Sequence, residues 1–320
     1  MAETSDLIEA FDARAERRAD RRNFFKAFGT ASAIAGGFTL ASQVPPAFGQ
    51  AAPSDGDILN FALNLEYLEA QFYAFAATGA GLPAGSLGGT GTPGAATGGR
   101  QVTFTDQIVA QYAREIAADE RAHVDFLRTA IGATAVAQPA IDISADANGA
   151  FSNAARAAGL VGPGVAFDPY ANDENFLLAA FIFEDVGVTA YKGASPLLSS
   201  KVFVEAAAGI LAVEAYHAAL VRTTLYAKGL AAPSLIDATE AISNARDSLD
   251  GVSDLDQGIR ASGSGLNTTS NIAPLDGDGL AYSRSAGQVL NIVYLNRTAV
   301  TGGGFFPNGV NGALRMSTAN

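Results

Sequence analysis

The sequence predicts an all-α protein built on a four-helix bundle, with one long crossover between the second and third helices and an irregular C-terminal extension. Three observations predict this fold. Four long segments between residues 55 and 229 carry apolar residues at helical spacing. Capping residues or glycines bound most of these segments. The longest connection, residues 133–171, follows the second helix, as in bundles with a single crossover.

The N-terminal region precedes the bundle and is typical of an export signal. Residues 20–26 read DRRNFFK, a pair of arginines followed by an aromatic pair and a lysine, as in twin-arginine signals. Residues 27–42 are mildly apolar but too short and too rich in small residues for a good membrane span. Small residues between 47 and 51 offer cleavage sites. We therefore expect residues 1–51 to be removed and the mature chain to be periplasmic or extracellular.

Capping signals set the boundaries of the bundle helices. Ser54 and Thr105 are the expected N-caps of the first two helices, and Gly79 and Gly132 are their expected stops. A short turn at 193–199 separates the third helix from the fourth. The expected helices are therefore 55–77, 106–131, 173–192 and 201–228.

The C-terminal part of the chain has a weaker helical pattern. A fifth helix is expected at 234–249, and a short one at 285–295. Between and after them glycine, serine, asparagine and aspartate dominate. We expect residues 52–232 to form the bundle and residues 233–320 to pack on it as a helix and an irregular extension.

Composition excludes several classes of function. The net charge is −12, so an anionic partner such as nucleic acid is not expected. The chain has no cysteine, which excludes disulfides, thiolate metal sites and cysteine nucleophiles. No serine lies in a Gly-x-Ser-x-Gly elbow, and the glycine runs lack the strand–helix context of a phosphate loop.

Both histidines of the chain follow a glutamate at the same spacing. Glu120 precedes His123 on the second helix, and Glu214 precedes His217 on the fourth. Positions three apart lie on one face of a helix, so each pair points both side chains the same way. This is the Glu-x-x-His arrangement of metal centres in helical bundles.

The other two helices each contribute a glutamate. Glu184 lies in the apolar run FIFEDV, where a carboxylate is costly to bury unless it is paired or binds a cation. Glu66 lies on the first helix. Oxygen and imidazole donors suit iron and manganese, so we expect two Fe or Mn ions. The candidate ligands are Glu66, Glu120, His123, Glu184, Glu214 and His217.

An internal repeat extends this pattern. Tyr73 follows Glu66 by seven residues, and Tyr191 follows Glu184 by seven. Each tyrosine therefore lies two turns along the same face, where its hydroxyl could hydrogen-bond a ligating carboxylate from another helix. Ordinary core packing is the alternative. The repeated order suggests two similar helical hairpins.

On these six positions the chain resembles the ferritin-like superfamily over about residues 55–229. Residues 286–312, AGQVLNIVYLNRTAVTGGGFFPNGVNG, resemble the C-terminal segment of the desiccation-related proteins of plants and bacteria, which carry a ferritin-like domain. The chain is identified by this resemblance as an exported bacterial member. The resemblance implies that Glu120 and Glu214 bridge the two metals. It also implies that the other two glutamates are terminal ligands and that each histidine binds one metal.

Some acidic residues near the ligands are expected outside the metal centre. Glu69 lies one turn beyond Glu66 and could compete as a ligand, but we expect it on the flank. Glu115 and Asp119 are expected in solvent. The loop between the first two helices is far longer than in cage-forming ferritins, which disfavours an iron-storage shell.

Three functions fit these observations. The first is a di-metal redox protein that acts on O2 or peroxide under oxidative or desiccation stress, for example as a ferroxidase. The second is a manganese catalase. The third is a non-enzymatic scaffold whose metal is structural or absent. The apolar helix faces also allow a homodimer.

Overall fold

The four predicted bundle helices are all present, and the all-α fold class is confirmed. The computed structural model describes residues 52–320, so the predicted export signal lies outside the described residues. Seven α-helices and two short strands occur in this part of the chain. The bundle helices are α2 (Asp55–Thr78), α3 (Gln107–Ile131), α5 (Asp173–Ala194) and α6 (Lys201–Gly229). The remaining elements are β1 (Ala96–Thr97), β2 (Ile141–Asp142), α4 (Ala150–Ala157), α7 (Ser234–Asp250) and α8 (Ala286–Val293).

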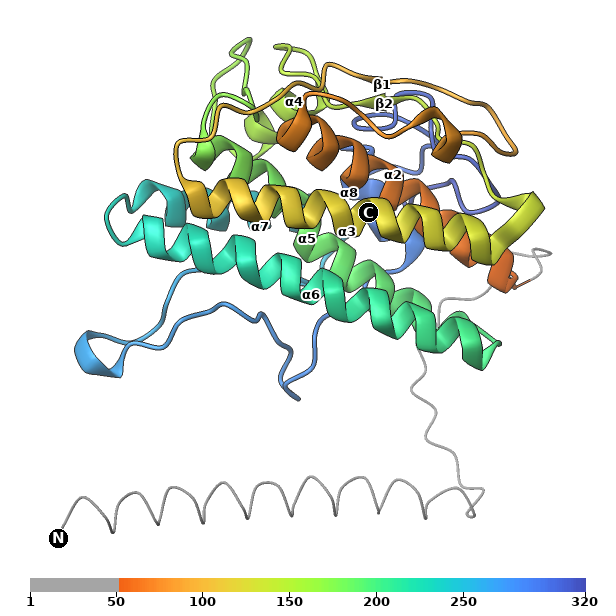
Figure 1. The fold of residues 1–320 in the computed structure, drawn as a ribbon. Coiled ribbons are helices and arrows are strands. Elements are labelled where there is room, and N and C mark those ends of the chain that lie inside the picture. Colours follow the sequence, from red (N-terminus) through yellow and green to blue (C-terminus); the bar gives the residue numbers. More distant parts are fainter. Residues whose placement is uncertain (1–51) are drawn as a thin grey trace, which may run out of the picture. The chain divides into compact units, whose positions relative to one another are not determined.

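The bundle consists of two antiparallel hairpins, α2–α3 and α5–α6 (Figure 1). The end of α2 meets the segment before α3, where the Val102 amide donates to the Ala76 carbonyl at 3.0 Å. The end of α6 meets the start of two other helices, because Lys228 Nζ lies 3.0 Å from Glu174 on α5 and 3.1 Å from Asp106 before α3. The helix faces that carry the candidate ligands therefore surround one interior.

Side-chain caps begin four of the seven described α-helices, and one predicted cap is corrected. Ser54 caps α2 as predicted, and its hydroxyl accepts from the Asp57 amide at 3.2 Å. The predicted cap of α3 at Thr105 is wrong, because the Asp106 carboxylate accepts from the amide of Ile108 at 2.9 Å. The Thr105 hydroxyl is occupied elsewhere, as it donates to the Asp173 carboxylate at the start of α5.

The long crossover is more ordered than the sequence indicates. It contains α4, which was not predicted, and β2, which pairs in parallel with β1 from the loop between α2 and α3. Phe151 of α4 packs on Phe72 of α2, with ring centroids 5.3 Å apart. The two long loops thus hold each other and cover one side of the bundle.

The C-terminal extension is fixed to the bundle by polar contacts as well as by α7 and α8. The side chain of Asn64 on α2 bonds the backbone of Asn311 twice: its Nδ2 donates to the Asn311 carbonyl and its Oδ1 accepts from the Asn311 amide, both at 2.9 Å. A buried network of three arginines and three aspartates joins α5 and α6 to the extension. Its members are Asp185, Arg222, Arg246, Asp250, Asp256 and Arg284.

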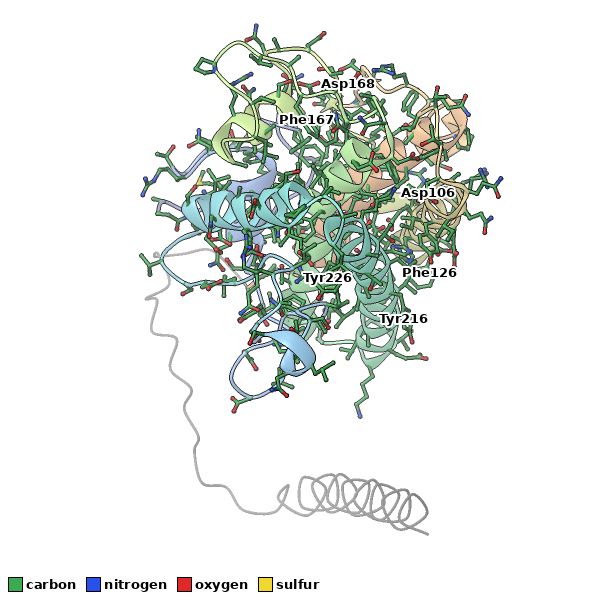
Figure 2. The ribbon with its side chains drawn as sticks, turned by 90° about the vertical axis from the view of Figure 1, so that its left-hand side faces the viewer. Asp106, Phe126, Phe167, Asp168, Tyr216 and Tyr226 are labelled. Atoms are coloured by element: carbon green, nitrogen blue, oxygen red, sulfur yellow. The ribbon has the colours of Figure 1, made fainter. Side chains whose placement is uncertain are left out.

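One described helix, α6, is long and apolar enough to cross a membrane by length and composition. Its inner face carries Glu214 and His217, which are buried in the bundle. Its outer face exposes Tyr216 to 70%, and α3 exposes Phe126 to 46%. Figure 2 shows these two side chains at the outer surface of α6 and α3. The apolar composition of α6 therefore reflects a buried face and an exposed one within the same bundle.

Candidate metal centre

The six predicted ligands meet inside the bundle. Each of the four helices contributes at least one of these residues. Because the glutamate and histidine of each Glu-x-x-His pair are three residues apart, both side chains point into the bundle. All six residues are buried, with at most 8% of their surface exposed. The structure arranges them in two groups that share Glu120. The first group is Glu66, Glu120, His123 and Glu214, and the second is Glu120, Glu184 and His217.

The first group surrounds one nitrogen of His123. Nδ1 lies 3.2 Å from Glu66 Oε2, 3.6 Å from Glu120 Oε2 and 3.8 Å from Glu214 Oε1. Oxygen and nitrogen donors bind divalent metals at about 2.1 Å, so neighbouring donors on one ion lie about 3.0–3.5 Å apart. Most of these separations fall in or close to that range, so the group fits one ion with small adjustments.

The second group surrounds Nδ1 of His217. This nitrogen lies 2.9 Å from Glu120 Oε1 and 3.6 Å from Glu184 Oε2. The two oxygens of Glu120 thus face different histidines, as expected of a carboxylate that bridges two ions. Glu214 belongs only to the first group, so the geometry gives the bridging position to Glu120 more clearly than to Glu214.

Several donor atoms of the two groups have no other use in the fold. Among residues 52–320, six of these buried atoms have no hydrogen-bond partner: both carboxylate oxygens of Glu120 and of Glu214, Oε2 of Glu184 and Nδ1 of His217. A buried polar atom without a partner is costly, typically by about 1–3 kcal/mol. Metal coordination would satisfy all of them, so the donor set fits two cations such as Fe or Mn.

The two tyrosines join the hairpins across the centre. Tyr73 of α2 donates its hydroxyl to Glu184 of α5, and Tyr191 of α5 donates to Glu66 of α2. The hydrogen bond from a tyrosine to a carboxylate on another helix, predicted from the sequence repeat, is therefore present at both positions. Each bond uses Oε1 of the glutamate and leaves Oε2 facing a histidine.

Asp119 was expected in solvent but contacts the centre. Its carboxylate lies 3.2 Å from His217 Nε2, although the side chain is 43% exposed. A carboxylate only accepts, so Nε2 carries the proton and donates it, and Nδ1 is left to face the carboxylates. This contact depends on how α3 and α6 are placed against each other, which helical spacing alone does not give. Glu115, one turn earlier, is exposed as predicted.

We expect Asp119→Ala to lower the affinity of the centre for Mn(II) or Fe(II) by about 10–100-fold, because carboxylates that orient a ligating histidine have effects of this size. Competition against a metal chelator would measure the change. Glu115→Ala, on the same helix, serves as the control and should bind metal as the wild type does. Equal affinities for the two variants would contradict the role of Asp119.

Glu69 lies on the flank of the centre, as expected, and is buried there. The residue is 6% exposed and lies outside both ligand groups. Burial raises the pKa of its carboxyl well above the usual range, and the neighbouring carboxylates Glu120, Glu184 and Glu66 raise it further. The sequence signal that could have predicted this burial is the position of Glu69 three residues after Glu66, on the same inward face.

The carboxylates also control the protonation of the imidazoles. Burial by itself would lower the pKa of His123, but Glu66 and Glu120 raise it to about 11. Burial likewise opposes the charged form of His217, while Glu120, Glu184 and Asp119 raise its pKa to about 9. Without metal, both imidazoles are therefore positively charged at neutral pH, with a proton on each ring nitrogen, and a metal ion must displace the proton from the nitrogen that it binds.

Metal affinity should accordingly rise with pH. The pKa values of about 11 and about 9 lie above neutrality, so fewer metal-competent imidazoles exist as pH falls. While the pH is below the pKa of an imidazole, the metal affinity should rise about tenfold per pH unit for each proton that the metal displaces. Calorimetric titrations with Mn(II) at pH 6, 7 and 8 would show stronger binding and proton release in buffers of different ionisation enthalpy. Binding that is independent of pH would contradict imidazole coordination.

Comparisons with known proteins locate the similarity in the same region. The family described as a ferritin-like domain matches residues 54–227. The ferritin-like catalase Nec2 of Nesocodon mauritianus is 30% identical over 273 residues, covering 82% of this chain and 85% of that protein. The desiccation-related protein PCC13-62 of Craterostigma plantagineum is 38% identical over 177 residues, covering 54% of this chain and 53% of that protein. No solved structure matches significantly.

Proposed function

Since this chain belongs to the ferritin-like family, we propose that it holds two Fe or Mn ions in the buried centre and breaks down hydrogen peroxide. The observation that carries the proposal is the set of buried donor atoms without hydrogen-bond partners, arranged in two groups around the shared Glu120. The relative named a ferritin-like catalase supports peroxide as the substrate.

The overall reaction consumes two molecules of peroxide. One loses two electrons and two protons and leaves as dioxygen; the other gains them, breaks its O–O bond and leaves as two waters. Bound iron or manganese would supply the exchange of electrons, since both metals change oxidation state readily. Glu66, Glu120, Glu184 and Glu214 would balance the metal charge. Tyr73 and Tyr191 hold two of these carboxylates in place by hydrogen bonds.

The proposal also covers the place and purpose of the reaction. The twin-arginine pattern at residues 20–26 supports export to the periplasm or beyond. The relative named a desiccation-related protein supports a role in stress. We propose that the exported protein removes peroxide formed under drying or oxidation. The exposed Phe126 and Tyr216 support a homodimer through α3 and α6.

An oxygen electrode distinguishes this function from its alternatives. Protein loaded with Mn(II) or Fe(II) should release one O2 for every two molecules of hydrogen peroxide, and Glu120→Gln should release none. Consumption of O2 with Fe(II), without release of O2 from peroxide, would favour a ferroxidase. A loaded protein that does neither would favour a scaffold and contradict the proposal.

A further inference from the structure

The two hairpins differ at one position next to the centre. Glu66 on α2 corresponds to Glu184 on α5, and a tyrosine follows each glutamate by seven residues. Three residues after these glutamates the hairpins carry different residues, Glu69 on α2 and Gly187 on α5. The near-symmetric ligand set is thus flanked by an additional carboxylate on one hairpin and by bare backbone on the other.

The missing side chain at Gly187 makes room for two carboxylates. A Cβ atom at this position would lie 2.2 Å from Glu214 Oε2 and 3.5 Å from Glu69 Oε1. The first distance is too short for any real contact, so even alanine would displace Glu214. Glycine therefore allows Glu214 to reach the first ligand group and leaves the carboxylate of Glu69 next to it.

Glu69 faces a small void. The residue is only 6% exposed. It is the only charged residue lining a void of about 20 Å³, whose walls include Val186 of α5, Ile292 of α8 and Phe305 of the extension. A space of about 10–15 Å³ suffices for one water molecule. The void therefore admits only a molecule of a few heavy atoms, such as hydrogen peroxide or azide.

We propose that hydrogen peroxide binds in this void, beside Gly187, with the carboxyl group of Glu69 hydrogen-bonded to it. This assignment rests on the proposed function and makes it more specific. Substrate then reaches the centre from the α2–α5 side, opposite the helices that carry the two histidines. The apolar walls supplied by α8 and Phe305 restrict the substrate to hydrogen peroxide and exclude organic hydroperoxides. Glu69 is a substrate-binding residue rather than a metal ligand.

A substitution that fills the void tests whether small ligands bind there, and it does so without measuring catalytic activity. Val186→Leu adds a methylene group to the wall, and Val188→Leu makes the same change two residues later, where the side chain lines a separate cavity of about 160 Å³ with room for it. Absorption titration of the metal-loaded proteins with sodium azide would give a dissociation constant for each. Val186→Leu should weaken azide binding at least about tenfold with metal content unchanged, and Val188→Leu should leave it unchanged. Equal azide affinities in the two variants would overturn the proposal.

Glu69→Gln tests the carboxyl group at constant size. We expect wild-type metal content, a KM for hydrogen peroxide raised about tenfold and a much smaller change in kcat, since one hydrogen bond to substrate is altered. Loss of metal would show that Glu69 is a ligand, and an unchanged KM would show that it does not meet substrate; either result overturns the proposal. If the loaded wild type releases no O2 from peroxide, the proposed function fails, but the azide comparison still decides whether small ligands enter at this void.

Discussion

Glu120→Gln should empty both metal positions while the bundle remains folded. Glu120 is the only residue that belongs to both ligand groups, and its two oxygens face different histidines. Glutamine keeps the shape of the side chain but cannot bridge two cations. Without metal the ionised Glu120 faces two protonated imidazoles, so its loss leaves them with one anion fewer, and the metal-free variant should melt below the metal-free wild type. Elemental mass spectrometry and thermal melts would measure the two quantities.

Two further variants test whether the loss of both metal ions is specific to Glu120. Glu184→Gln affects only the second group and should leave about one ion per chain. Glu115→Gln, exposed on the same helix as Glu120, should retain both ions. A Glu120→Gln protein that still carries two ions per chain would contradict the bridging position of Glu120 and the division into two groups.

Arg284→Met should be the most destabilising single change in the extension, by about 3–5 kcal/mol. Arg284 is fully buried and donates to Asp250 at 2.6 Å, to Asp256 at 2.6 Å and to Thr189 at 3.0 Å. Methionine fills much of the space but leaves the Asp250 carboxylate without its cation. For a chain of this size the loss corresponds to a decrease in Tm of about 6–20 °C.

The control for this change is another arginine in an ion pair. Arg260 lies 2.7 Å from Asp237, but both side chains are more than half exposed. Exposed pairs contribute little, so Arg260→Met should alter stability by less than about 1 kcal/mol. Urea or thermal unfolding of both variants would make the comparison. Similar losses in the two variants would show that the buried network does not hold the extension to the bundle.

The bundle and the gathering of the six donors could be predicted because both depend on local spacing. Apolar periodicity places the helices, and the interval of three residues places Glu120 with His123 and Glu214 with His217 on shared faces. The interval of seven residues likewise predicted that each tyrosine reaches a carboxylate on another helix. These features need only the helical repeat and the assumption that the apolar faces meet.

The remaining features depend on contacts between distant parts of the chain. The bond from Asp119 to His217 requires the crossing of α3 and α6, and the burial of Glu69 requires α8 and Phe305 to cover α2. Arg222 of α6 donates to the backbone carbonyls of Gln257 and Gly258 only when the extension folds back on the bundle, and Arg284 then donates to Thr189 of α5. No local sequence pattern marks such residues. From the sequence alone, a single charged residue is expected to be exposed to solvent.

X-ray diffraction from crystals of the metal-loaded protein, recorded on either side of the Mn and Fe absorption edges, tests the central claim most directly. Anomalous difference maps should show two peaks about 3.5–4 Å apart, one beside His123 and one beside His217, with Glu120 between them. The edge at which the peaks appear would identify the metal. An ordered centre with no peak in crystals of protein exposed to both metals, or peaks only at surface carboxylates, would contradict the account.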